Sequence, residues 1–488
     1  MSRLRSTPIP GTRDSYTQVD FNLGFHVRHY DVSLDYVVAP NRLKAVVTLS
    51  MDNYQPLRSL TLDLSDALTV KSVTTQGTSA VAVKVQKFRH SNHKLRISFT
   101  EEIPVDQEFK ITVTYSGNPR PIRSTWGLIG WEELSNGSLV ASQPNGARSW
   151  LPCDDTPDEK ALYTMSITCD SPYTVVANGE LLGTTRHGSR TQWRYQTQHP
   201  MASYLATVQV GRYERYELGA AGEVPVIAYA PPALAAGVRH DFSDQAAMLE
   251  LFSQLFGPYP FDQYSVVVTE DDLEIPLEAQ GLSIFGANHA GGTKQWERLI
   301  AHELAHQWFG NSLGLAQWDD IWLNEGFACY AEWLWFEHSA GIPAAVTAAQ
   351  HYERLAQLPA DIVVAAPGAR DMFDDRVYKR GALTLHALRM LLGSAAFSAP
   401  LHVMLRRVGI PLWSRWIYVV SCSRKWILRR SWMRCGMRGC MRLRCQNGHG
   451  NIDGCETYAG HRRRRFYWFE FCQACSCYPS GVSGHGTR

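Results

Sequence analysis

The first half of the chain alternates apolar and polar residues with a period of two. Residues 32–36 (VSLDY) and 109–115 (FKITVTY) show this alternation, and Asn, Pro and Gly residues separate such runs. Because successive strand side chains point to opposite faces, the pattern indicates strands with one buried and one solvated face. We predict a largely antiparallel β domain over residues 26–230, after an N-terminal extension over residues 1–25.

The period of the pattern changes near residue 231. Residues 242–252 place Phe, Met and Leu side chains on one helical face, a strand is predicted at 264–269, and helical patterns dominate afterwards. We therefore predict an α+β fold in which a second, α/β domain covers residues 231–406.

The composition changes again after residue 406. Residues 407–488 contain 14 Arg, one Lys, five Trp and eight of the 11 Cys, with no sustained helical or strand period. Excess Arg, Cys and Trp with scarce Lys is typical of a shifted reading frame, so we expect an out-of-frame or disordered tail. A real metal or nucleic-acid module is the alternative. The other 406 residues carry 33 basic and 43 acidic side chains and three scattered cysteines, which suit a reducing compartment.

No targeting or membrane signal stands out in the sequence. The N-terminal arginines have no apolar run behind them, and no stretch approaches 18 consecutive apolar residues. We expect a cytoplasmic protein without a membrane or nucleic-acid partner. The oligomeric state does not follow from the sequence.

The run AHELAHQWFG at 301–310 contains the most specific chemistry. His302 and His306 are four residues apart, which on a helix places them on one face, about 6 Å apart, where they can share a metal ion. A catalytic zinc takes three protein ligands and leaves one position to water. Glu325, in the run WLNEGF, follows far enough downstream for one helix to end, a turn to pass and a second helix to begin near Asn324. These three residues are the predicted Zn²⁺ ligands.

Two further glutamates are expected near this metal. Glu303 follows the first ligand and would reach the bound water without binding the metal, as a general base does. Glu332 lies seven residues after Glu325, on the same helix face, and is expected to orient a metal-binding imidazole. A solvated helix glutamate is the alternative for Glu332.

Four segments together carry a family resemblance. They are the zinc segment from AHELAHQWFG to WLNEGF, LEAQGLSIFG at 277–286, SQPNGARSWLPCDDTPDEKALY at 142–163, and RVYKRGALTLHALR at 376–389. Over roughly residues 20–405 the chain resembles the M1 family of zinc aminopeptidases. The resemblance implies a saddle-like β domain followed by a thermolysin-like catalytic domain, which we expect to be truncated after about residue 406.

The resemblance also implies site roles. Tyr378 matches the tyrosine that stabilises the oxyanion, Glu278 the carboxylate that pairs with the substrate ammonium, and Gln143 a neutral hydrogen-bonding partner. The exopeptidase motif departs from the family pattern, since Ile275, Leu277 and Ala279 replace Gly, Met and Asn. The preferred N-terminal residue therefore cannot be transferred from the family.

The predicted function is zinc-dependent hydrolysis of N-terminal residues from peptides with a free N-terminus. One alternative is a catalytically impaired or inactive product of a disrupted M1 peptidase. A minor alternative is an epoxide hydrolase of the leukotriene A4 hydrolase type. That chemistry uses a second tyrosine, and the matching position here is Phe373.

Overall fold

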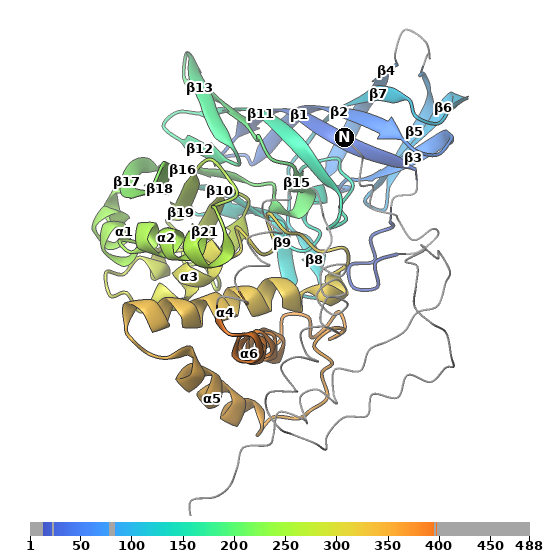
Figure 1. The fold of residues 1–488 in the computed structure, drawn as a ribbon. Helices are drawn as coiled ribbons and strands as arrows, with labels where there is room; N and C mark the ends of the chain where they lie inside the picture. The colour runs from blue at the N-terminus through green and yellow to red at the C-terminus, as the bar shows by residue number, and fades with distance from the viewer. Residues whose placement is uncertain (1–12, 22–23, 78–82, 395–396, 398–488) are drawn as a thin grey trace, which may run out of the picture. The chain divides into compact units, whose positions relative to one another are not determined.

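The structure is a computed structural model that describes residues 13–21, 24–77, 83–394 and 397 (Figure 1). The predicted tail at 407–488, the truncation expected near 406 and the first 12 residues of the predicted extension lie outside the described residues.

The N-terminal part of the chain consists of strands. The largest sheet has the order β13-β14-β11-β1-β2-β7-β4, with β15 beside β11, and only the β1–β11 pair is parallel in it. A three-stranded sheet has the order β3-β6-β5, and a five-stranded sheet the order β12-β16-β10-β9-β8. The strands are β1 (Phe25–Val37), β2 (Arg42–Asn53), β3 (Leu57–Asp63), β4 (Leu68–Gln76), β5 (Val85–Ser91), β6 (Lys94–Ile103), β7 (Glu108–Gly117), β8 (Ile122–Ser124), β9 (Gly127–Leu134), β10 (Gly137–Ala141), β11 (Lys160–Asp170), β12 (Thr174–Ala177), β13 (Glu180–His187), β14 (Arg190–Gln196), β15 (Met201–Ala202) and β16 (Val208–Gly211).

The buried residues of the strands follow the predicted period-two pattern. On β1, Val32, Leu34 and Tyr36 are buried while the residues between them are not. On β7 the buried residues alternate in the same way, from Phe109 to Tyr115. The predicted half-buried, largely antiparallel β domain is confirmed.

A second, mixed sheet follows in the chain. Its order is β17-β18-β19-β21-β20, with β18–β19 and β19–β21 parallel and the outer pairs antiparallel. The predicted division after residue 230 falls inside this sheet, because β18 pairs with β17 on one side and with β19 on the other. Strand pairing thus groups residues 214–230 with the residues that follow. The strands are β17 (Glu214–Ala221), β18 (Val224–Ala230), β19 (Tyr264–Val268), β20 (Leu277–Ala279) and β21 (Leu282–Phe285).

All six α-helices of the described residues follow β18 in the chain. In Figure 1, α4 lies between α3 and α6 and contacts both, and all its residues from Trp322 to Trp335 are buried. Among the described residues, no helix is both long enough and apolar enough to cross a membrane. The α-helices are α1 (Ala235–Asp241), α2 (Gln245–Phe256), α3 (Glu297–Ala305), α4 (Trp322–Ser339), α5 (Ala344–Leu355) and α6 (Asp375–Leu392). The 3-10 helices are η1 (Ala147–Ser149), η2 (Ser203–Leu205), η3 (Pro232–Leu234), η4 (Ala287–His289) and η5 (Trp318–Asp320).

Two glycines set the distance between α4 and α6. A Cβ added to Gly381 would lie 2.7 Å from the Cα of Gly326, and a Cβ added to Gly326 would lie 2.8 Å from the Cα of Gly381. The two backbones are therefore in direct contact, which larger residues at this crossing would prevent. The contact brings Glu325 on α4 close to the first turn of α6, which carries Tyr378.

Asp155 is a buried acid in the loop before β11. Its Oδ1 accepts a hydrogen bond from the Ser203 hydroxyl (2.9 Å) and its Oδ2 accepts one from the Arg148 backbone N–H (3.3 Å). Burial, followed by the charge of Asp63, raises the pKa of Asp155 from 3.8 to about 7. The folded protein thus binds this proton more tightly than the unfolded chain does. The resulting stabilisation is complete below about pH 4 and is lost as the pH rises to about 7.

We expect Asp155→Asn to remove this pH dependence. Asparagine resembles the protonated acid, its oxygen can accept from the Arg148 N–H, and the Ser203 hydroxyl can rotate to accept from its amide. We therefore compare the free energy of unfolding of the variant with that of wild type at each pH. This difference should shift in favour of the variant by on the order of 2–4 kcal/mol between pH 5 and pH 8. Urea midpoints at both pH values measure this difference. The exposed Glu101→Gln change controls for the lost charge, and an equal offset at both pH values for Asp155→Asn would contradict the prediction.

Candidate metal and peptidase site

The two histidines lie at the end of α3. His302 is in its last turn and His306 is the residue that caps it, and their ring centroids are 4.8 Å apart. The chain then turns at Gly310, where φ is +123°, a backbone conformation that glycine adopts without strain. The local prediction of two imidazoles on one helix face is confirmed by this geometry.

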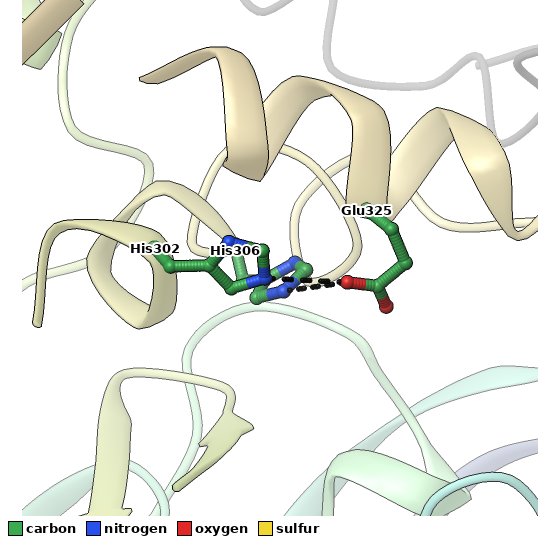
Figure 2. Close-up of side chains that lie close together, drawn as sticks. All are labelled: His302, His306 and Glu325. Atoms are coloured by element: carbon green, nitrogen blue, oxygen red, sulfur yellow. Dashed lines mark hydrogen bonds and ion pairs between the residues drawn. The ribbon is translucent and has the colours of Figure 1, made fainter. Parts of the chain in front are cut away.

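The predicted third ligand comes back on α4. This helix begins at Trp322, two residues before the predicted start, and Glu325 lies in its first turn. Glu325 Oε2 is 3.3 Å from His302 Nε2 and 3.4 Å from His306 Nε2, as the dashed lines in Figure 2 show. The three side chains converge although Glu325 lies on a different helix from the histidines.

The donor atoms fit a tetrahedral zinc ion. Donors bound at about 2.0–2.2 Å in a tetrahedron lie about 3.4 Å apart, close to the two Nε2–Oε2 distances here. The other nitrogen of each imidazole is occupied: His302 Nδ1–H donates to Glu332 Oε1 (2.7 Å), and His306 Nδ1–H donates to the Phe309 carbonyl (3.0 Å). Each Nε2 lone pair is therefore available to a metal.

The charges around these donors favour a cation. Glu278, Glu303 and Glu325 are at most 5% exposed, so three carboxyl groups share one buried region. Burial alone would raise the pKa of Glu325, but the charge of His306 and hydrogen bonds from both histidines lower it to about 2. Burial would also lower the pKa of His306, but Glu278 and Glu325 raise it to about 10. A divalent ion would supply the positive charge that the imidazoles otherwise carry.

Glu303 lies beside the predicted ligands without joining them. One of its carboxylate oxygens is within 4.8 Å of a donor atom of His306 and of a carboxylate oxygen of Glu278. Burial raises its pKa to about 7, although both histidines oppose the shift. A carboxyl group with such a pKa can take up and release a proton near neutral pH.

The residues assigned to the substrate amine also meet. Gln143, in the loop after β10, donates from Nε2 to Glu278 Oε1 at 2.7 Å, across 135 positions of sequence. Glu278 lies in the short edge strand β20, and burial raises the pKa of its carboxyl group. Gln143 and Glu278, the pair predicted to bind the substrate amine, therefore lie together next to His306.

Two residues that the sequence analysis did not single out hold β20 against the end of α3. Gln307 donates from Nε2 to the Ala279 carbonyl (3.1 Å) and accepts from the Gly281 N–H (2.8 Å). Asn311 also donates to the Ala279 carbonyl, at 3.0 Å. Both follow His306 closely in sequence, yet their partners are known only once the sheet is packed against the helix.

Tyr378 lies in the first turn of α6. Its ring stacks on His302, with centroids 5.9 Å apart and planes 22° from parallel, and the side chain is half-buried. Asp374 caps this helix by accepting from the Arg376 N–H (2.9 Å), which fixes where the helix begins. The Phe373 ring packs edge-to-face against Trp126, with ring centroids 6.1 Å apart.

The chain matches known proteins across both parts of this architecture. A peptidase M1 N-terminal domain matches residues 26–205 and a peptidase family M1 domain matches residues 241–410. The structure of an M1 zinc metallopeptidase from Deinococcus radiodurans is similar at 30% identity and a TM-score of 0.75, covering 86% of this chain and 94% of that chain. A mutant of that metallopeptidase bound to a Tyr-Ser-Ala substrate matches at 30% identity and a TM-score of 0.71, covering 81% and 89%.

Relatives among curated proteins are longer than this chain. Glutamyl aminopeptidase from Mus musculus is 23% identical over 423 residues, which cover 78% of this chain and 43% of the relative. The chain spans about half the length of the curated relatives it matches. The chain belongs to peptidase family M1, which confirms the family predicted from its four motifs.

Proposed function

We propose that this chain is a zinc aminopeptidase that removes N-terminal residues from peptides. The observation that carries the proposal is the place of Glu278, a buried carboxyl group beside the three converging donors His302, His306 and Glu325. An endopeptidase needs the metal donors but not this extra anion. The relatives named as aminopeptidases and the Deinococcus structure with a tripeptide support the same reading.

The three donors would hold the zinc ion in this proposal. When bound, such an ion supplies an acidified water and polarises the scissile carbonyl. Glu303 would take a proton from the attacking water and pass it to the leaving amine, a role for which a carboxyl pKa near neutrality is suited. Tyr378, whose ring is held against His302, donates its hydroxyl proton in a hydrogen bond to the developing oxyanion.

Glu278 binds the N-terminal ammonium group of the peptide and so fixes which peptide bond is cleaved. A substrate ammonium ion paired with this carboxylate places the first peptide bond of the substrate near Glu303, and Gln143 keeps Glu278 oriented through the 2.7 Å hydrogen bond. An internal peptide segment has no ammonium group and would leave the buried Glu278 carboxylate without its charge partner from the substrate, which is costly. Free N-terminal peptides are therefore the expected substrate class.

Blocking the substrate amine should abolish cleavage. Acetylation removes the ammonium charge, and we expect kcat/KM for an acetylated peptide to fall by at least about 10³-fold relative to the free peptide. Glu278→Gln should lower kcat/KM for the free peptide by a similar factor and reduce the discrimination between the two substrates. Peptide cleavage followed by mass spectrometry measures both. Efficient hydrolysis of the acetylated peptide by wild-type protein would reject the role of Glu278.

Measurements of zinc content and of turnover decide between an active aminopeptidase and the impaired-product alternative. One zinc per chain with cleavage of an amino-acid arylamide supports the aminopeptidase, whereas zinc retention without turnover supports the impaired-product alternative. Within the part of the chain that the structure describes, no contact favours the epoxide hydrolase alternative, since Phe373 carries no hydroxyl and packs on Trp126. A cytoplasmic location is part of the proposal and is supported by buried free thiols at Cys153, Cys169 and Cys329.

A further inference from the structure

Glu332 receives hydrogen bonds from two residues of α3. Its Oε1 accepts from His302 Nδ1 (2.7 Å) and from Arg298 Nη1 (3.0 Å), and the carboxylate side chain is only 2% exposed. Arg298 precedes His302 by four residues, one helical turn, so both side chains leave α3 on the same face. The carboxylate that orients the imidazole is thus itself tied to a guanidinium group.

A second buried cation, on α6, lies against the part of α4 that carries this carboxylate. Lys379 is 8% exposed, and its Nζ lies 3.4 Å from Cys329 Sγ and 3.6 Å from Asp375 Oδ1. Burial lowers the pKa of Lys379, but the charge of Glu332 is the largest of the interactions that outweigh burial and raise it. The ammonium group contacts α4 at Cys329, about one helical turn before Glu332, so its charge acts on the Glu332 carboxylate through the low-dielectric interior.

We propose that Arg298 and Lys379 are positioning residues for the metal centre. Arg298 holds the Glu332 carboxylate by a direct hydrogen bond, and the nearby charge of Lys379 stabilises it, so that it accepts from His302 Nδ1 and keeps His302 Nε2 directed at the zinc ion. The inference rests on the zinc site of the proposed function. Without these cations, Glu332 would be a buried anion whose only strong donor is the imidazole, and burial of such a group without counter-charge is expensive. The direct partner of a metal-binding histidine, here Glu332, typically contributes about 10–100-fold to metal affinity. The two cations act through Glu332, so losing either one should cost up to that factor.

The arrangement also involves three helices, with direct hydrogen bonds between α3 and α4 and a charged group from α6 beside them. Glu332 is on α4, Arg298 on α3 and Lys379 on α6, directly after Tyr378. The helix α6 therefore carries both a residue that helps to orient the zinc ligand His302 and Tyr378, the proposed oxyanion donor. Loss of either cation should affect the metal first and turnover as a consequence.

The test uses the full chain, stripped of metal and titrated with zinc against a chromogenic chelator. We expect Arg298→Gln and Lys379→Met each to weaken zinc binding by up to about 10–100-fold and to change the visible absorption of the Co²⁺-substituted protein. Arg298→Lys, which retains the charge, should recover part of the affinity. Arg389→Gln is the matched control, because it breaks a 2.7 Å ion pair between α6 and α4, with Glu337, that does not include Glu332 or His302.

The inference fails if Arg298→Gln binds zinc as tightly as wild type, or if Arg389→Gln weakens binding equally. Arg298 is half exposed on the surface, so its substitution tests the inference even if Lys379→Met does not fold. Because zinc affinity is read without turnover, the result is separate from the proposed function. Wild-type protein that binds zinc tightly but cleaves no peptide would overturn the function and leave this inference in place.

Discussion

Glu303→Gln protein is expected to bind one zinc ion per chain and to turn over peptides about 10²–10⁴-fold more slowly than wild type. Glutamine has nearly the same shape but cannot take a proton from water. The contacts that orient the predicted ligands run from His302 to Glu332 and from His306 to the Phe309 carbonyl, so they do not depend on the Glu303 side chain. Metal analysis and steady-state kinetics on the same preparation measure both quantities.

The comparison needs a variant that removes the metal. His306→Ala should lose both zinc and turnover, because a donor atom disappears. If Glu303→Gln instead retains wild-type kcat, Glu303 is not the base. If it loses its zinc, Glu303 helps to hold the metal, and the assignment of three protein ligands is wrong.

Gly381→Ala is expected to destabilise the protein and to impair the site at a distance. The new Cβ would lie 2.7 Å from the Cα of Gly326, so α4 and α6 must separate. Overpacking of this kind costs about 1–3 kcal/mol, and a shift of about 1 Å in a catalytic group can cost about 100-fold in rate. We expect a lower urea midpoint and a kcat/KM reduced by about 100-fold, since Glu325 and Tyr378 lie on the two separated helices.

The sign of the stability change makes this experiment decisive. In an ordinary helix interior, Gly→Ala stabilises by about 0.5–1 kcal/mol, because alanine restricts the unfolded chain and favours the helix. Thr384→Ala, at a partly exposed position on the same helix, controls for changes in helix propensity. A Gly381→Ala protein that is more stable than wild type and fully active would show that the two helices tolerate greater separation.

Local patterns predicted the elements better than their pairing. The strand alternation at β1 and β7 is visible because side-chain direction depends only on the adjacent backbone. The same alternation cannot say which sheet a strand joins, and so the division predicted after residue 230 did not anticipate that β18 pairs with β19, which places β17 and β18 in the second sheet. Strand partners depend on residues far away in sequence, and one strand pattern is compatible with many of them.

The candidate site shows the same limit. His302 and His306 were predictable because four residues of helix bring them together whatever the rest of the chain does. The meeting of Gln143 with Glu278 was suggested only by family resemblance, and the structure supplies its distance. Arg298, Lys379 and Gln307 carried no signal of their own, because an isolated charged or amide residue on a helix is most often a solvated one.

By itself, then, the sequence determined the change from strands to helices along the chain, the helical histidine pair and the glutamate available to complete a zinc site. Tertiary structure alone decided how closely α4 and α6 approach, through the contact of Gly326 with Gly381, and which side chains surround Glu332. The physical reason is the sequence range of the interactions. Backbone conformation and the contacts between residues i and i+4 act within about one helical turn. Convergence on one buried carboxylate requires three helices to be packed first.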